Sequence, residues 1–275
     1  MAGLFEALAA ALRAGEPVAL AEVIEGPEEH FGAKLVVRPG GDPVALGTLG
    51  DPDLDRVVTR DALGELAAGL SVTRHYGRHG EARARDVGVF IESFAPPPRM
   101  VIFGAVDFTA ALARVAKVLG YHVTVCDARP VFATRARFPM ADEVVVAWPD
   151  RHLAEVGPLL GPRDAVCVLT HDPKFDVPAI TAALRTSVGY LGAMGSRRTT
   201  LEREGRLREA GVDDRGLARV MAPIGLDVGA RTPEETAVAI CAEIIASRTG
   251  RAAPSLRDAE GPIHRDAPAP APSPA

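Results

Sequence analysis

Apolar positions in residues 1–95 follow helical spacing in two stretches and strand-like spacing elsewhere. The stretch LFEALAAALRAG repeats apolar residues at helical intervals and ends at Gly15, and a second helix is predicted from Asp51 to about Leu70. Short apolar runs bounded by glycine predict strands. These runs are PVALAEVIEG, AKLVVRPG, PVALGTL, SVTRHYG and DVGVFIESF. Residues 1–95 are therefore expected to form a small α+β domain.

From residue 99 the pattern changes to apolar runs that alternate with helical segments. The runs are typical of strands covered on both faces in a parallel sheet, namely MVIFGA, HVTVCD, EVVVAW, AVCVLT and SVGYLGAMG. Helices are expected at residues 108–119, 151–160, 177–186 and 196–210, and a last helix, EETAVAICAEIIAS, should close the domain. Right-handed crossovers then give an α/β fold, a Rossmann-like doubly wound parallel sheet that binds ligands at its carboxyl edge.

Two proline-rich stretches mark the ends of this second domain. SFAPPPR places a stiff linker at residues 96–98, between a domain at 1–95 and a domain at 99–250. Beyond Gly250 the chain reads RAAPSLRDAEGPIHRDAPAPAPSPA, which has no periodicity and few large apolar residues. Such a segment cannot offset its ordering entropy by burial, so residues 251–275 are predicted to be a disordered tail.

Composition narrows the classes of function. The chain has 275 residues, 47% of them hydrophobic and 24% charged, which is enough for two cores. The net charge of −5 is spread along the chain, and three Tyr and one Trp give little aromatic surface, so no nucleic-acid partner is expected. No apolar run approaches the roughly 20 residues of a membrane span, and the start lacks a secretory signal. We expect a cytoplasmic protein without a membrane partner.

Cysteine and histidine spacing gives no metal or disulfide framework. Cys126, Cys167 and Cys241 lie far apart inside apolar runs, so they are interpreted as core residues. His75 and His79 have the spacing of zinc ligands on a helix, but their segment has strand and glycine character, so they would not share a face.

The turn after the first strand of the second domain only partly matches a dinucleotide-binding loop. Gly104 is in place, but Val106 and Thr109 occupy the second and third glycine positions of G-x-G-x-x-G. Asp107 is expected to accept the free amide hydrogens at the start of the helix, which disfavours a phosphate there. Asp127 stands where a ribose-binding acid would, although it is equally explained as a turn residue.

Polar residues follow the fourth strand, in the segment THDPKFD. Its His, Asp and Lys side chains are expected to face the ligand crevice, and Thr170, His171 and Asp172 are the candidate binding residues. His171 would carry a proton or donate a hydrogen bond. The alternative is an ordinary turn.

The strongest anion signal follows the fifth strand, in the segment GAMGSRR. Backbone amides, the helix dipole and guanidinium groups converge there on one place. The residues concerned are Gly195, Ser196, Arg197 and Arg198. The alternative is a solvated helix start. A glycine-rich loop further on adds Gly225 and Asp227, and Thr232–Glu235 is a capping box.

Five segments follow one another in an order too long and specific to be chance: FGA, CDARPVFATRARFPMADEV, THDPKFD, YLGAMGSRR and PIGLDVGARTPEETAVAICAEII. They resemble the XdhC/CoxI family, the accessory proteins of molybdenum hydroxylases such as xanthine dehydrogenase, over about residues 99–248. In that family the molybdenum cofactor, an anionic pterin phosphate or dinucleotide, is held, helped to gain its terminal sulfur and passed to the apo-enzyme. The resemblance implies molybdopterin as cargo and a molybdenum hydroxylase as partner, and it leaves open a cysteine desulfurase and a homodimer.

The first domain and the first turn depart from the family pattern. Residues 26–34, GPEEHFGAK, keep only the ends of a segment that usually contains serine, proline and arginine, and residues 47–51, GTLGD, lack a cysteine usual there. Residues 104–107, GAVD, replace glycine-alanine-glycine-histidine. The leading hypothesis is a binding protein that needs no catalytic residue. The alternatives are a non-catalytic interaction module, which these losses favour, and an NAD(P)-dependent oxidoreductase, which the missing glycines and the lack of an evident hydride-transfer acid disfavour.

Overall fold

A computed structural model gives the structure of residues 2–40, 44–82 and 84–258. The chain divides between Pro96 and Pro97 into two compact units. Of the predicted disordered tail, residues 259–275 lie outside the described residues, whereas Leu256–Asp258 form a short 3-10 helix, η3. In the part of the chain that the structure describes, no helix is long and apolar enough to cross a membrane.

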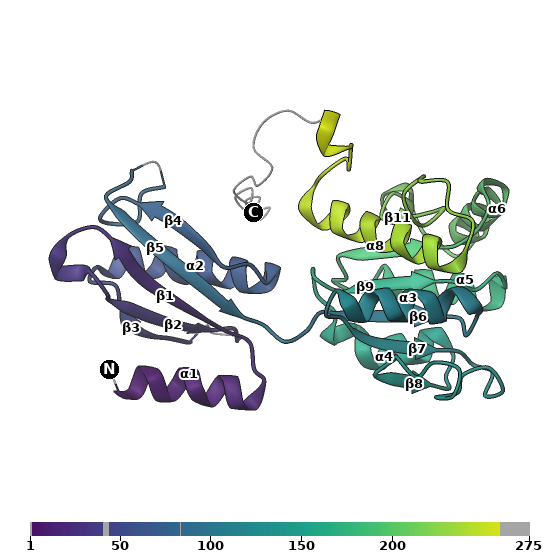
Figure 1. The fold of residues 1–275 in the computed structure, drawn as a ribbon, viewed down its shortest axis with the longest axis horizontal. Coiled ribbons are helices and arrows are strands. Elements are labelled where there is room, and N and C mark those ends of the chain that lie inside the picture. The colour runs from purple at the N-terminus through teal and green to yellow at the C-terminus, as the bar shows by residue number, and fades with distance from the viewer. Residues whose placement is uncertain (1, 41–43, 83, 259–275) are drawn as a thin grey trace. The chain divides into compact units, whose positions relative to one another are not determined.

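The first unit is a five-stranded antiparallel sheet with the strand order β3-β2-β1-β5-β4 (Figure 1). Its elements, in chain order, are α1 (Ala2–Ala14), β1 (Val18–Glu25), η1 (Glu28–His30), β2 (Lys34–Arg38), β3 (Val44–Thr48), α2 (Pro52–Ala68), β4 (Val72–Tyr76) and β5 (Val87–Phe94). The predicted helices and strands of this unit are all present. Asp51 caps α2 by accepting from the amides of Asp53 and Leu54, and Gly69 ends the helix in the left-handed region.

Alternation along the central strands gives each face of this sheet its own helix. Leu35 and Val37 of β2 pack with Leu54 and Val58 of α2. Val36, which points the opposite way, packs with residues of α1. His75 and His79 bond to different carboxylates, those of Glu25 and Asp51.

The second unit is a six-stranded parallel sheet with the order β11-β10-β9-β6-β7-β8. Its elements are β6 (Arg99–Phe103), α3 (Asp107–Val118), β7 (His122–Cys126), β8 (Glu143–Val145), α4 (Pro149–Val156), η2 (Gly157–Leu159), β9 (Ala165–Val168), α5 (Pro173–Ala183), β10 (Tyr190–Ala193), α6 (Arg197–Glu209), α7 (Asp214–Leu217), β11 (Val220–Met221) and α8 (Pro233–Thr249). The order reverses between β6 and β9, which places the topological switch point of a Rossmann fold there. The predicted α/β class and the doubly wound sheet are confirmed.

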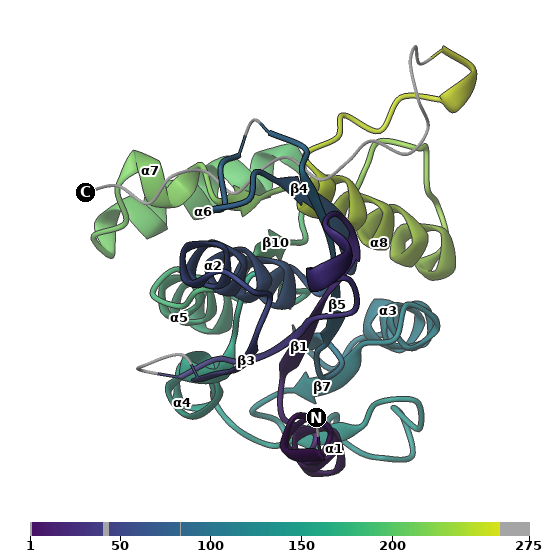
Figure 2. The ribbon, with the colours of Figure 1, turned by 90° about the vertical axis from the view of Figure 1, so that its left-hand side faces the viewer.

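Helices cover both faces of the parallel sheet (Figure 2). On one face α3 and α8 pack on Met100, Ile102 and Cys167, and on the other α4, α5 and α6 pack on Val101 and Phe103. Apolar runs are expected wherever a strand is covered on both sides, and this explains why they identified the strands. The three cysteines are buried, as predicted. Burial raises the pKa of Cys126 to about 12 and that of Cys241 to about 11, which keeps these thiols protonated at neutral pH.

Some element boundaries differ from the prediction, and two short elements were not expected. β8 ends at Val145, before the predicted end of its apolar run at Trp148. α5 begins at Pro173 rather than 177, because Asp172 caps it and proline occupies its first position. The two-residue strand β11 and the four-residue helix α7 were not predicted, since neither is long enough to show a period.

Candidate functional site

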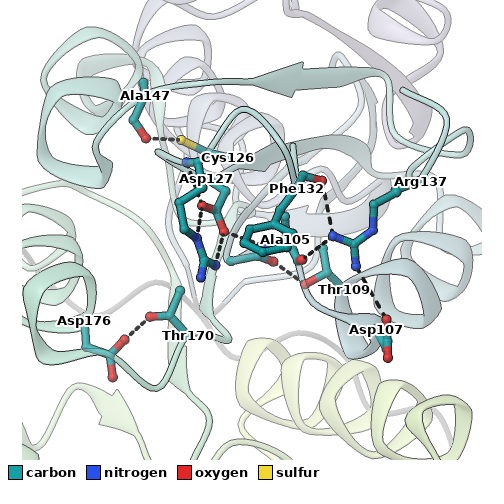
Figure 3. Close-up of polar contacts among 12 residues, drawn as sticks. Ala105, Asp107, Thr109, Cys126, Asp127, Phe132, Arg137, Ala147, Thr170 and Asp176 are labelled. Atoms are coloured by element: carbon teal, nitrogen blue, oxygen red, sulfur yellow. Dashed lines mark hydrogen bonds and ion pairs between the residues drawn. The ribbon is translucent and has the colours of Figure 1, made fainter. Parts of the chain in front are cut away.

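The carboxyl ends of the parallel strands bring together the loops on which the chemical expectations rest. Figure 3 shows residues of the loops after β6, β7 and β9 at this edge, among them Ala105, Asp127 and Thr170. Open α/β sheets bind ligands in this position, next to the switch point. The geometry of each loop decides which side chains remain available to a ligand.

Gly104 permits a close contact between the two loops at the switch point. Its φ is +110°, and a Cβ at this position would lie 2.8 Å from Cγ2 of Thr170 and 3.1 Å from the backbone nitrogen of Thr170. Any side chain would therefore push the loop after β9 away from the loop after β6. The contact with Thr170 is thus sufficient to explain why residue 104 is glycine, and no bound phosphate is needed to explain it.

The expectation that Asp107 caps α3 is wrong. The N-cap residue is Val106, no side chain caps this helix end, and Asp107 is the first helical residue. Its carboxylate is 91% exposed and lies 3.5 Å from a guanidinium nitrogen of Arg137. Thr109, in the third glycine position, is buried, and its hydroxyl donates to the carbonyl of Gly104. The turn is thus closed by a threonine hydroxyl, and Asp107 pairs with Arg137.

The carboxylate of Asp127 is hydrogen-bonded to residues of the neighbouring loop and of its own loop. Its side chain is 2% exposed, and it accepts hydrogen bonds from the amide of Ala105 at 2.8 Å and from Nε and Nη2 of Arg129 at 2.9 and 2.8 Å. Burial alone would raise the pKa of Asp127, but the hydrogen bonds from Arg129 and Ala105 lower it overall. An ionised carboxylate therefore joins the first and second loops, and Arg129 occupies the oxygens that a ribose would need.

Arginine and aromatic side chains gather beside this pair. We call them the arginine–aromatic cluster, which consists of Arg129, Phe132, Arg137, Trp148 and Phe175. The guanidinium carbon of Arg129 lies 4.6 Å from the ring centre of Phe132 and 5.7 Å from that of Phe175. The rings of Phe175 and Trp148 are 4.9 Å apart. Arg137 donates to the carbonyl of Ala105 at 3.0 Å. The cluster joins the loops after β7 and β8 to the first turn of α5.

Two residues of the polar segment after β9 are turned into the interior. Thr170 and Asp176 are buried, and the hydroxyl of Thr170 donates to the Asp176 carboxylate (Figure 3). Asp176 also accepts from Arg203 of α6, at 2.9 Å, and Arg203 donates to the carbonyl of Met194 at 2.6 Å. Burial raises the pKa of Asp176 in spite of the neighbouring Thr170 and Arg203. This buried network connects the loop after β9 to the loop after β10.

Most of the other predicted residues of these two loops are exposed. His171 lies on the surface, and Asp172 caps α5 by accepting from the amide of Lys174 at 3.0 Å. Ser196 caps α6 through the amide of Thr199 at 3.1 Å.

At the start of α6, Arg197 is exposed, and Arg198, 89% exposed, lies 3.6 Å from Glu202 on its own helix. A Cβ on Gly195 would meet the side chain of Thr199 at 3.3 Å, so this glycine lets the loop pack against α6. The two arginines are therefore presented to solvent at a helix N-terminus, as an anion site requires.

Gly225 and Asp227 have different surroundings. The amide of Gly225 donates to Glu243 of α8 at 2.8 Å, and a Cβ there would lie 3.3 Å from the amide nitrogen of Ile240. Gly225 therefore docks its loop on α8, whereas Asp227 is exposed. Binding of a cofactor by any of the predicted residues stays a prediction.

Two features of this edge were not found from the sequence. The partners Asp176 and Arg203 are far apart in the chain, although Arg203 does share the buried face of α6 with Thr200 and Leu207. That periodicity was the available signal for a buried arginine. The pairing of Asp127 with Arg129 is local, and an aspartate followed two residues later by arginine at a strand end was a sufficient pattern to suggest it.

Comparisons with known proteins agree on one family. A family model described as the XdhC Rossmann domain matches residues 100–244, and one described as the XdhC and CoxI family matches residues 11–77. The chain is 35% identical over 195 residues to a Bacillus subtilis (strain 168) protein that is named as a probable subunit of xanthine dehydrogenase. The match covers 65% of this chain and 56% of that relative.

Two further likenesses extend the comparison. The molybdenum cofactor insertion chaperone PaoD of Escherichia coli (strain K12) is 27% identical over 159 residues, which cover 58% of this chain and 43% of PaoD. The chain spans about half the length of the curated relatives it matches. A crystal structure described as a xanthine dehydrogenase from Bacillus halodurans shares the fold, with a TM-score of 0.51 and 22% identity over 92% of this chain and 97% of that one.

Proposed function

The chain belongs to the XdhC and CoxI family, and on that premise we propose that it binds a molybdopterin-type cofactor and helps to insert it into a molybdenum hydroxylase. Two relatives support this proposal, one named as a molybdenum cofactor insertion chaperone and one as part of a xanthine dehydrogenase. The cofactor is the cargo of such a protein. The site then needs groups that hold an anionic pterin and release it, and it needs no catalytic residue.

One observation carries the proposal: arginines stand exposed at the ligand-binding edge of the parallel sheet. Arg197 and Arg198 open α6 at the carboxyl end of β10, and Arg129 is 45% exposed beyond β7. Guanidinium groups and helix-start amides are the donors that bind phosphate in proteins. A phosphate-bearing cargo fits the donors at the start of α6, Arg129 adds a further exposed cation at the same edge, and this exposure is consistent with a cargo that must leave again.

The same edge disfavours a nicotinamide dinucleotide bound at the first turn. Val106 and Thr109 stand where a pyrophosphate loop has its second and third glycines, and the Thr109 hydroxyl fills the turn by donating to Gly104. The Asp127 carboxylate is already bonded to Ala105 and Arg129. A ribose diol would have to displace Arg129 from a buried, ionised acid. An oxidoreductase that uses NAD(P) is therefore the weaker proposal.

Binding can be separated from the alternatives by titration of the full chain. We expect molybdopterin to bind more tightly than NAD or NADP, with the affinities of all three compared by equilibrium dialysis. Micromolar binding of NADP without binding of molybdopterin would reverse this ranking. Failure of both ligands to bind, with retained binding to a molybdenum hydroxylase, would identify an interaction module instead.

Insertion is tested separately, with the cofactor-loaded chain and an apo-hydroxylase. We expect hydroxylase activity to appear faster than with free cofactor at the same concentration. Equal rates would restrict the role to storage of the cofactor.

A further inference from the structure

The arginine–aromatic cluster contains two aromatic side chains that are partly exposed at the carboxyl edge of the sheet. Phe132 is 39% exposed and Trp148 is 42% exposed, so each keeps part of its aromatic surface open to solvent. Both lie at the carboxyl edge, in the loops after β7 and β8. Exposed rings at the ligand-binding edge of a doubly wound sheet offer flat surfaces for stacking.

The charged members of the cluster are fixed in orientation before any ligand arrives. Arg129 is held by a bidentate pair with the buried Asp127, at 2.9 and 2.8 Å, and keeps 45% of its side-chain surface exposed. Arg137 is held by the carbonyls of Ala105 and Phe132, at 3.0 and 3.4 Å, and it lies 3.5 Å from the exposed carboxylate of Asp107, which a ligand anion would replace. A guanidinium group held in this way loses little conformational freedom when a ligand binds, so its contribution to affinity is larger.

The two guanidinium groups lie around one ring. The guanidinium carbons of Arg129 and Arg137 are 4.6 and 5.7 Å from the ring centre of Phe132. Flat cations and an aromatic ring together favour a ligand that is itself flat, through stacking, and that carries negative charge. A ribose is excluded as the recognised group, because Arg129 occupies both oxygens of Asp127.

We propose that the arginine–aromatic cluster binds the flat ring of an anionic heterocycle, which is the pterin ring of the cargo. This assignment rests on the proposed function and deepens it, because it gives the ring a place distinct from the phosphate site at the start of α6. The ring stacks on Phe132 and Trp148, and Arg129 and Arg137 face its negatively charged substituents. Recognition of the ring and recognition of the phosphate are then made by different loops of the same edge.

The chain reports on this site by itself, because Trp148 is the one tryptophan in the sequence. The experiment titrates the full chain with 6-carboxypterin, a flat pterin with one carboxylate and no phosphate, and follows tryptophan emission. We expect saturable quenching. Phe132→Leu keeps an apolar side chain of similar size but removes the ring, and it should weaken binding about tenfold, since stacking on one aromatic ring contributes roughly that factor or more.

A matched control lies in the other unit. Phe5 of α1 is 72% exposed and is not a member of the cluster, so Phe5→Leu makes the same chemical change at a residue outside it and should leave the titration unchanged. Absence of quenching in the parent protein would overturn the proposal, as would equal affinity of the parent and the Phe132→Leu variant.

Failure of the proposed ring site can be distinguished from failure of the proposed function. If protein purified from cells that make the cofactor carries molybdopterin equally in the parent and in Phe132→Leu, the function stands and the ring lies elsewhere. If the parent carries no pterin, the proposed function fails as well. If Phe132→Leu instead loses binding to a molybdenum hydroxylase and keeps its affinity for 6-carboxypterin, the cluster is a protein-docking surface and the proposal is wrong.

Discussion

Helix α6 carries arginines in two contrasting environments within two turns. Arg203 is 4% exposed and is bonded to Asp176 and to the carbonyl of Met194. Arg197 and Arg198, at the start of the same helix, are exposed. An arginine that is bonded inside the chain holds loops in place, whereas an exposed arginine remains available to a ligand. On α6, the buried Arg203 therefore stabilises the fold, whereas the exposed Arg197 and Arg198 are free to bind a ligand.

Arg129 lies between these extremes. Its carboxylate partner, Asp127, is buried, but the arginine itself is 45% exposed and stacks on Phe132. It joins two loops and still presents charge to solvent. Substitution of a buried arginine should therefore lower the free energy of unfolding, and substitution of exposed arginines should weaken ligand binding without unfolding the protein.

The largest effect is expected for Arg203→Met. The substitution leaves the buried Asp176 carboxylate without its charged partner, and breaking such a pair costs about 3–5 kcal/mol. Urea unfolding measures this loss. Arg206→Met, an exposed position on the same helix, is the control and should change stability by less than about 0.5 kcal/mol.

A second variant separates the charge from the packing. In Arg203→Met with Asp176→Leu no buried charge remains, so most of the lost stability should return. Equal, small losses for Arg203→Met and Arg206→Met would show that the buried pair contributes nothing and would remove the basis of the comparison.

The next effect is expected for Asp127→Asn, at about 2 kcal/mol, because hydrogen bonds to a charged group contribute roughly 1.5–3 kcal/mol. The pKa of Asp127 is lowered in the folded protein, so its ionised form stabilises the fold above its ordinary pKa of 3.8. That contribution disappears as the pH falls through the lower, folded value. Unfolding of parent and variant should therefore differ at neutral pH and converge below pH 3.8. A difference independent of pH would mean that the charge is not involved.

At the exposed end of α6, replacing both Arg197 and Arg198 with alanine should weaken molybdopterin binding at least about tenfold, which is about 1.4 kcal/mol. Each charged hydrogen bond to a phosphate contributes roughly that much. Stability should change by less than about 0.5 kcal/mol, as at other exposed positions. Isothermal titration and urea unfolding of the same preparation measure both quantities. If the double variant binds as the parent does, the helix start is merely solvated.

The smallest effect is expected for Asp107→Ala. Asp107 does not cap α3, and its ion pair with Arg137, at 3.5 Å, is exposed, so its loss should cost less than about 0.5 kcal/mol. Thr109→Val is the informative partner, because it removes a buried hydroxyl that donates to Gly104. Thermal unfolding should rank Thr109→Val as the more damaging of the two. The reverse ranking would restore Asp107 as a helix cap.

The strands and the fold class could be predicted because burial on both faces leaves a continuous apolar record in each strand. The roles of the polar residues were harder to predict, because they depend on hydrogen-bond partners that are distant in the sequence. Asp176 was interpreted as part of a polar loop, yet it pairs with Arg203 of another helix. Asp107 was assigned to a cap from its position alone, whereas the helix began one residue earlier than a cap requires.

The start of α5 shows a different limit. Asp172 followed by Pro173 is the signature of a helix start, and it was available in the sequence. The same residues also fit a turn, so the local pattern alone does not fix where α5 begins. By contrast, the exposure of Arg197 and Arg198 follows from the local sequence, since two arginines after a capping serine rarely find room in a core.

The most direct test of the account is the identity of the small molecule that accompanies the chain. The full chain, purified from cells that make the molybdenum cofactor, is denatured, and the released compounds are oxidised and identified by mass spectrometry and pterin fluorescence. The account predicts a pterin phosphate or pterin dinucleotide in the parent protein and a much smaller amount when Arg197 and Arg198 are both alanine. Release of NAD or NADP without any pterin, or equal amounts of pterin from the parent and the double variant, would contradict it.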